Sequence, residues 1–105
     1  MTDAGIPAGV SLETIYVVEV SYAPEAREKR PAVRPEHLSH LARLMDEGRV
    51  IEAGGFLDFS AALLLVRASS EEEAIALFRD DVYIRAGVWM EDVRARAFGR
   101  VVRDR

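Results

Sequence analysis

The chain has no cysteine among its 105 residues. Without a thiol it cannot form a disulfide bond, use a thiolate nucleophile or build a cysteine-ligated zinc site. It also lacks a long hydrophobic run, because its longest apolar segment is residues 61–66. A membrane-spanning helix needs about 20 apolar residues. These absences exclude thiol chemistry and argue against a helical membrane span.

Signals of export, nucleic-acid binding and nucleotide cofactors are missing as well. The first residues, MTDAGIPAGVSLE, have no basic segment followed by an apolar core, so we predict a cytoplasmic protein without a signal peptide. The 14 Lys and Arg residues are outnumbered by 18 Asp and Glu, which gives a net charge of −4 and disfavours a nucleic-acid binder. Neither a G-x-G-x-x-G motif nor a Walker loop occurs, so no cofactor is expected. A solvated strand edge and tail explain the C-terminal arginines better than phosphate binding does: Arg94, Arg96, Arg100, Arg103 and Arg105.

The remaining pattern is that of one α+β domain. Half of the residues are hydrophobic, which is enough to build one core. After a flexible arm over residues 1–13, the domain spans residues 14–105. Its predicted elements are a strand over 14–22, a helix over 35–48 that starts after a break at Pro31, strands over 49–57 and 61–68, a helix over 69–80, a turn over 81–87 and a strand over 88–102. The order βαββαβ predicts a ferredoxin-like fold, an antiparallel sheet with two helices on one face.

The third predicted strand is apolar on both faces. Leu63 and Leu65 point to one side, and Leu64 and Val66 point to the other. A half-exposed sheet would alternate apolar and polar residues, so something covers the second face. We predict a homodimer packed sheet to sheet, the alternative being an exposed apolar face that favours aggregation.

Two histidines lie on the first predicted helix. A helical wheel places a core stripe along Leu38, Leu41, Ala42 and Met45, with His37 at its border and His40 on the outer face beside Glu36. On this wheel His40 is a dispensable surface residue, whereas His37 can reach the rim of the sheet. A metal site built from the two histidines is disfavoured, and none is predicted.

Adjacent aspartates follow the second predicted helix, where the helix dipole disfavours negative charge. Arg79 or Arg85 could offset the charge of Asp81 locally. A histidine from the first helix is the other possible partner, since both segments can meet at one sheet edge. A carboxylate on one imidazole nitrogen leaves the other nitrogen free to accept a proton.

Taken together, the segments RPEHLSHLARLMDEGRVIEAGG, SSEEEAIALFRDDVY and AGVW, with Asp58 between the first two, resemble the YciI-like (YCII-related) family. The resemblance covers residues 15–98. It implies a dimeric α+β barrel, in which two ferredoxin-like subunits pack sheet to sheet.

The resemblance also implies a catalytic dyad, with His37 in the position of the family histidine and Asp81 in that of its aspartate. It implies substrate-binding positions at Arg34, Gly54, Asp58 and Tyr83. The chain departs from the family pattern where Val82 and Gly55 replace prolines and where Ser60-Ala61 stands in place of glycines, so the pocket wall is expected to be looser.

Two functions fit these features. The first is a small lyase or isomerase in which His37 exchanges a proton with a hydroxylated or carbonyl substrate, Asp81 orients the imidazole and Arg34 holds an anionic group. The second is a dimer that binds a small ligand in the same pocket without turnover.

Overall fold

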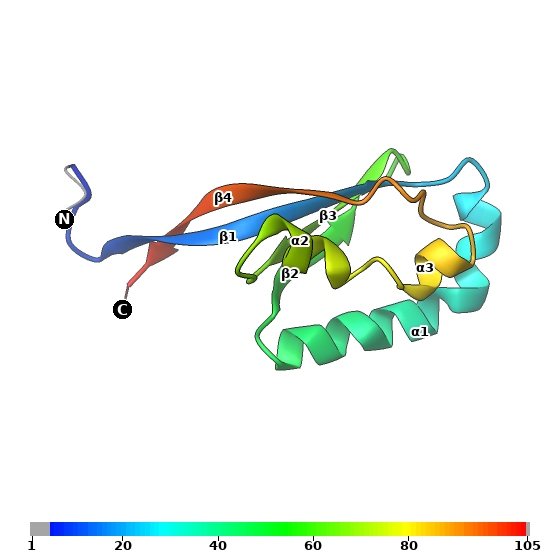
Figure 1. The fold of residues 1–105 in the computed structure, drawn as a ribbon, viewed down its shortest axis with the longest axis horizontal. Helices are drawn as coiled ribbons and strands as arrows, with labels where there is room; N and C mark the ends of the chain where they lie inside the picture. The colour runs from blue at the N-terminus through cyan, green and yellow to red at the C-terminus, as the bar shows by residue number, and fades with distance from the viewer. Residues whose placement is uncertain (1–4, 105) are drawn as a thin grey trace.

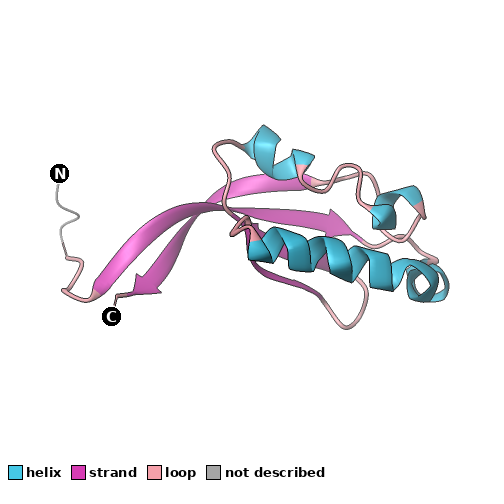
Figure 2. Ribbon diagram, turned by 90° about the horizontal axis from the view of Figure 1, so that it is seen from below, coloured by secondary structure: helices cyan, strands magenta, loops and turns pink. Residues whose placement is uncertain are grey.

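The computed structural model describes residues 5–104 and has the predicted α+β architecture. Its sheet has the strand order β2-β3-β1-β4, and each neighbouring pair is antiparallel, as in a ferredoxin-like fold. The helices lie on one side of this sheet (Figures 1 and 2). In chain order the elements are β1 (Val10–Ser21), α1 (Ala26–Asp46), β2 (Val50–Gly55), β3 (Ala61–Val66), α2 (Glu71–Ala76), α3 (Val82–Arg85) and β4 (Arg94–Arg103).

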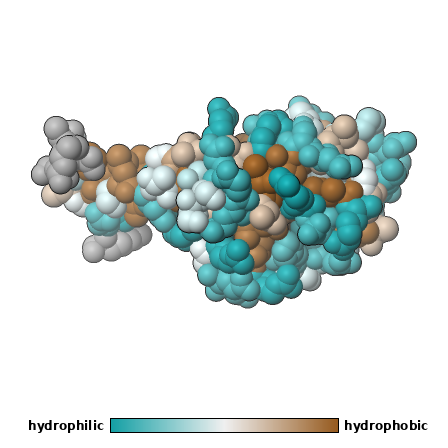
Figure 3. Space-filling view, viewed as in Figure 1, coloured by the Kyte–Doolittle hydropathy of each residue, from teal (hydrophilic) through white to brown (hydrophobic). Residues whose placement is uncertain are grey.

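Strands β1 and β4 differ from the prediction at their ends. β1 begins at Val10, so residues 10–13 of the predicted arm belong to the sheet, while residues 1–4 lie outside the described residues. Pairing with β4 explains the difference, because Leu12 lies opposite Val101 at the end of a two-stranded ribbon. The ribbon projects from the body and carries apolar side chains on its surface (Figures 1 and 3). β4 itself starts at Arg94, six residues later than predicted.

Helix α1 starts much earlier than predicted, at Ala26, and contains both Pro31 and Pro35. The prediction that Pro31 breaks the helix is wrong. Proline has no N–H and its ring crowds the carbonyl one turn back, so it bends a helix where tertiary packing holds the chain helical. Figure 2 shows the result: the first turns of α1 point in a different direction from the long remainder.

The core stripe of α1 is also not the predicted one. Its buried residues after the bend are His37, Leu41 and Leu44, at the i, i+4, i+7 spacing of one helix face. Leu38 is 48% exposed and Met45 42%. The helical wheel chose the face with the most apolar residues, whereas the buried face of α1 includes His37.

The second predicted helix ends early and is followed by a separate helical turn. Ser70 caps α2 by accepting a hydrogen bond from the Glu73 N–H (3.1 Å), and the Glu73 carboxylate reaches back to Ser69, which confirms the predicted cap. α2 ends at Ala76 rather than near residue 80. Residues 82–85, predicted as a turn, form the short helix α3.

The sheet has a core face and an open face. On β3, Ala62, Leu64 and Val66 are buried beneath the helices, and Leu63 and Leu65 are half-buried on the other side. Val17 of β1 lies beside them on that open face. Strand β3 is therefore apolar on both faces of the sheet, as predicted.

Among the described residues, no helix is long and apolar enough to cross a membrane, and the cytoplasmic location stays a prediction.

Replacing a leucine of β3 by aspartate should affect the stability of the subunit differently on the two faces of the sheet. Leu64 is 1% exposed, so Leu64→Asp should lower the free energy of unfolding by about 3 kcal/mol or more and unfold the subunit. Leu63→Asp places its carboxylate on the open face and should leave the subunit folded. Circular dichroism during urea unfolding measures both. Equal losses of stability in the two variants would contradict the assignment of the faces.

Candidate active site

The site is organised around Asp81, which lies between α2 and α3. Its side chain is 0% exposed and caps α3 by accepting a hydrogen bond from the Tyr83 N–H at 2.9 Å. Asp81 does not pair with Arg79 or Arg85, so the local pairing considered from the sequence is wrong. Arg85 instead bonds to Glu36 at 3.2 Å and to the backbone carbonyl of Asp80.

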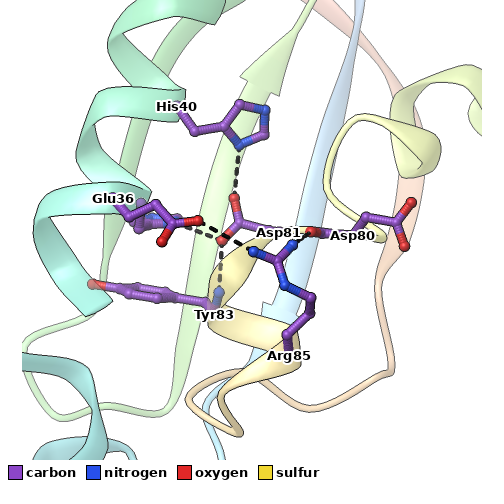
Figure 4. A network of polar contacts seen from close by, with 7 residues as sticks. Glu36, His40, Asp80, Asp81, Tyr83 and Arg85 are labelled. Atoms are coloured by element: carbon purple, nitrogen blue, oxygen red, sulfur yellow. Dashed lines mark hydrogen bonds and ion pairs between the residues drawn. The ribbon is translucent and has the colours of Figure 1, made fainter. Parts of the chain in front are cut away.

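Both histidines of α1 bond to this one carboxylate (Figure 4). His37 Nδ1 lies 2.7 Å from Asp81 Oδ2, and His40 Nδ1 lies 2.9 Å from Asp81 Oδ1. An ionised carboxylate only accepts hydrogen bonds, so each Nδ1 carries the hydrogen and donates. In the neutral state of each ring, Nε2 is then left as a proton acceptor.

These contacts set the charge of Asp81. Burial raises the pKa of its carboxyl, but hydrogen bonds from His37, from the Tyr83 N–H and from His40 stabilise the anion and outweigh burial. The net effect holds the pKa of Asp81 below its ordinary value of 3.8. Asp81 is therefore a carboxylate at neutral pH.

The imidazole of His37 is held by ring packing as well as by Asp81. It stacks on the Tyr83 ring with centroids 3.6 Å apart and an interplanar angle of 10°, and it meets the edge of Trp89 at 4.9 Å. Burial raises the pKa of the Tyr83 phenol, which keeps that group neutral. The ring of His37 thus has one orientation, fixed by a carboxylate, a stacking partner and an aromatic wall.

A cavity of about 270 Å³ lies beside His37, between α1 and the β2–β3 hairpin. Arg30 and Arg34 line it, and within residues 5–104 neither guanidinium has a carboxylate within 4.0 Å. The guanidinium of Arg30 instead lies 4.3 Å from the centroid of the Phe59 ring. The remaining walls are mainly apolar and aromatic: Tyr22, Leu38, Leu41, Phe56, Leu57, Phe59, Leu64, Tyr83 and Trp89. The cavity therefore suits a small, partly apolar anion.

The structure gathers most of the predicted site residues at this cavity. Arg34, Gly54 and Tyr83 line it together with His37. Asp58 does not: it lies in the β2–β3 turn, where its carboxylate accepts a hydrogen bond from the Ser60 N–H at 2.9 Å. This hydrogen bond explains an aspartate at that position by turn geometry.

The hairpin glycines have unequal roles. A Cβ on Gly54 would meet no atom within 4 Å, whereas a Cβ on Gly55 would lie 2.2 Å from the hydroxyl oxygen of Tyr22. The close approach of Tyr22 to the backbone therefore requires a glycine at position 55. Gly55 leaves room for the Tyr22 ring to form part of the cavity wall.

Sequence reasoning misplaced one polar residue of this site and missed two others. His40 was predicted on the outer face beside Glu36, and that prediction is wrong, because His40 bonds to Asp81 and Glu36 bonds to Arg85. Trp89 and Arg30 were not singled out. The Trp89 Nε1–H is the one buried side-chain nitrogen or oxygen within residues 5–104 that lacks a hydrogen-bond partner. As the chain's single tryptophan, it was a signal available in the sequence.

The lowered pKa of Asp81 predicts how its contribution to stability depends on pH. The ionised carboxylate stabilises the fold above its ordinary pKa of 3.8, and this stabilisation is lost as pH falls through the lower folded-state pKa. Asp81→Asn should lower the free energy of unfolding by about 2 kcal/mol at pH 5–7. The gap between variant and wild type should close below about pH 4. Urea unfolding at pH 7, 5 and 3 tests this, and a gap that widens at pH 3 would contradict it.

Comparison with known proteins identifies the family of the chain. A model of the YCII-related domain family matches residues 14–97. The proteins called Protein YciI from Escherichia coli O6:H1 and from Shigella flexneri are each 34% identical to this chain over 97 residues, which covers 83% of this chain and 98% of theirs. A protein of Emericella nidulans named "Derivative of benzaldehyde biosynthesis cluster protein C" is 30% identical over 83 residues, covering 69% of this chain and 85% of its own length. The chain therefore belongs to the YCII-related domain family.

Proposed function

We propose that this protein is a cofactor-free enzyme of the lyase or isomerase type, with His37 as its general acid and base. The observation that carries the proposal is the hydrogen bond of 2.7 Å between His37 Nδ1 and the buried Asp81 carboxylate. It fixes the tautomer in which Nε2 accepts a proton, on a ring that lines the cavity. Asp81 also stabilises the imidazolium that forms when His37 takes a proton.

The cavity walls support an anionic, partly aromatic substrate with a hydroxyl or carbonyl group. Arg34, and with it Arg30, supplies a positive charge that no carboxylate within residues 5–104 neutralises at contact distance. Tyr83 and Gly54 line the space next to His37, and the aromatic side chains of the wall favour a flat ring as part of the substrate. The printed name of the Emericella nidulans relative connects that protein with a derivative of benzaldehyde, which is an aromatic carbonyl compound. In this chemistry His37 removes the proton of the hydroxyl group and returns it to a carbon of the same molecule, so that an isomerisation leaves the number of protons unchanged; in a lyase reaction that carbon gives up its bond to the leaving group as it takes the proton.

The alternative is a ligand-binding dimer without turnover. The same cavity and arginines support it, because neither feature requires chemistry. The two functions differ at Asp81. A binding protein needs the charge of Arg34, but ligand binding does not require a single fixed tautomer of His37.

A double-mutant cycle separates these functions. If His37 and Asp81 act as one unit, His37→Ala and Asp81→Asn should each remove most of the turnover of hydroxylated aromatic aldehydes or carboxylates, by about 10²-fold or more. The double variant should be little worse than the worse single variant. Arg34→Ala should mainly raise KM.

Two results would contradict the proposal. One is a double variant whose loss of turnover equals the product of the losses in the two single variants. The other is a His37 imidazole whose NMR titration is unchanged by Asp81→Asn. Either leaves the ligand-binding dimer as the better function. Asp58→Asn serves as the control, since Asp58 holds a turn outside the cavity and its substitution should leave turnover unchanged within about twofold.

We also propose a homodimer packed through the open sheet faces. Val17, Leu63, Leu65 and Phe98 form an apolar surface there, with Phe56 at its border. An unassociated sheet face of this kind favours aggregation, and a second copy of the chain covers it with matching surface. Arg96 and the Glu19–Arg94 ion pair (2.7 Å) add polar groups around the apolar centre.

The dimer is tested by mass in solution. Light scattering at micromolar concentration should give twice the chain mass of 11.7 kDa for the wild type. Leu63→Asp should give the single-chain mass with secondary structure retained, because it places a charge in the interface. A wild-type monomer would refute the dimer without refuting the function proposed for the cavity.

A further inference from the structure

His40 has no part in the proposed chemistry, yet it shares the carboxylate on which that chemistry depends. Asp81 Oδ2 bonds to His37 and Asp81 Oδ1 to His40 (Figure 4). The two rings border different cavities. The one beside His40 measures about 260 Å³ and shares no lining residue with the cavity beside His37. Asp81 thus connects a ring at the proposed site with a ring at a separate opening.

One carboxylate can neutralise one imidazolium. When either ring takes a proton, the group of two imidazoles and Asp81 becomes neutral overall. A second proton would leave a net positive charge around a side chain that is 0% exposed, which burial and Coulomb repulsion both oppose. Because both rings share this one carboxylate, a positive charge on one ring opposes a positive charge on the other.

The charges around each ring decide which one takes the first proton. Apart from the shared Asp81, the cavity beside His40 is lined by two carboxylates and two guanidinium groups, from Glu36, Asp80, Arg43 and Arg85, and the side chain of His40 is 25% exposed. The cavity beside His37 is lined by two guanidinium groups, from Arg30 and Arg34, and by no carboxylate, with Tyr22 and Tyr83 as its other titratable groups. The His37 side chain is 6% exposed. The balanced charges beside His40 and its greater exposure thus favour a positive charge on that ring over one on His37, which has two guanidinium groups in its cavity.

We infer that His40 keeps His37 in its neutral, proton-accepting form by taking the first proton on the shared carboxylate. The inference rests on the proposed function, in which His37 is the base. His40 acts only through Asp81, so it is a positioning residue. Its effect is to extend the pH range in which His37 Nε2 can accept a proton toward the acidic side.

His40→Asn tests the inference. An asparagine amide can occupy the place of Nδ1 and donate to Asp81 Oδ1, but it cannot take a proton. With its competitor removed, His37 alone gains the stabilisation from Asp81. The midpoint of its titration, followed by NMR of the imidazole nitrogens, should rise by about one pH unit or more. In turnover, the acidic limb of the pH profile should move up by the same amount.

Two further variants separate charge from structure. His40→Leu removes both the hydrogen bond and the charge. If only the hydrogen bond mattered, His40→Leu would change the His37 curve and His40→Asn would not, which would overturn the inference. Ser39→Ala is the matched control, since Ser39 lines the same cavity as His40 but carries no charge. It should leave the His37 curve unchanged.

The wild-type titration decides the matter if His40→Asn does not fold. A coupled pair gives both rings two-step curves that share the same two midpoints. Independent single-step curves would overturn the inference. These titrations require no substrate, so absent turnover would refute the enzyme and leave the coupling intact. Unaltered titration curves combined with a loss of turnover in His37→Ala would do the reverse.

Discussion

The buried carboxylate of Asp81 is the contact on which the rest of the site depends. It receives hydrogen bonds from two rings of α1 and from the first turn of α3, and so it ties together segments more than 40 positions apart in the chain. Without it, the Tyr83 N–H and two imidazoles would each lose a partner. The long helix and the short one are placed relative to each other by a polar contact as well as by apolar packing.

Burying such a carboxylate is unfavourable, and the hydrogen bonds that Asp81 accepts offset the unfavourable free energy. Transfer of an unpaired carboxylate into a protein interior costs several kcal/mol. Here three donors converge on Asp81, and they outweigh burial in setting its pKa. Two of them are imidazoles, which can also take a positive charge. The arrangement stabilises an anion inside the protein and at the same time gives His37 the partner that a proton-transfer residue needs.

The sequence alone predicted the strands and the topology, and the resemblance to the YCII-related family implied the pairing of His37 with Asp81. The place of His40 was not predicted. Strands such as residues 61–66 are recognisable because β-branched and apolar residues dominate them. The start of α1 was missed because Pro31 and Pro35 are local signals that tertiary packing overrides. The wheel failed for a related reason. It ranked faces by hydropathy, whereas the buried face of α1 is defined by an aspartate 41 positions beyond His40.

The β2–β3 hairpin connects the proposed site with the proposed dimer interface. Gly54, Gly55 and Phe56 line the cavity beside His37, and the same three residues line a depression on the open face together with Leu63 and Leu65. The wall of the cavity is therefore one backbone layer thick at this point. A second copy packed on the open face would support that wall from behind, where the glycine pair gives it little stiffness of its own. Assembly and ligand binding would then share one structural element, and the loss of one would weaken the other.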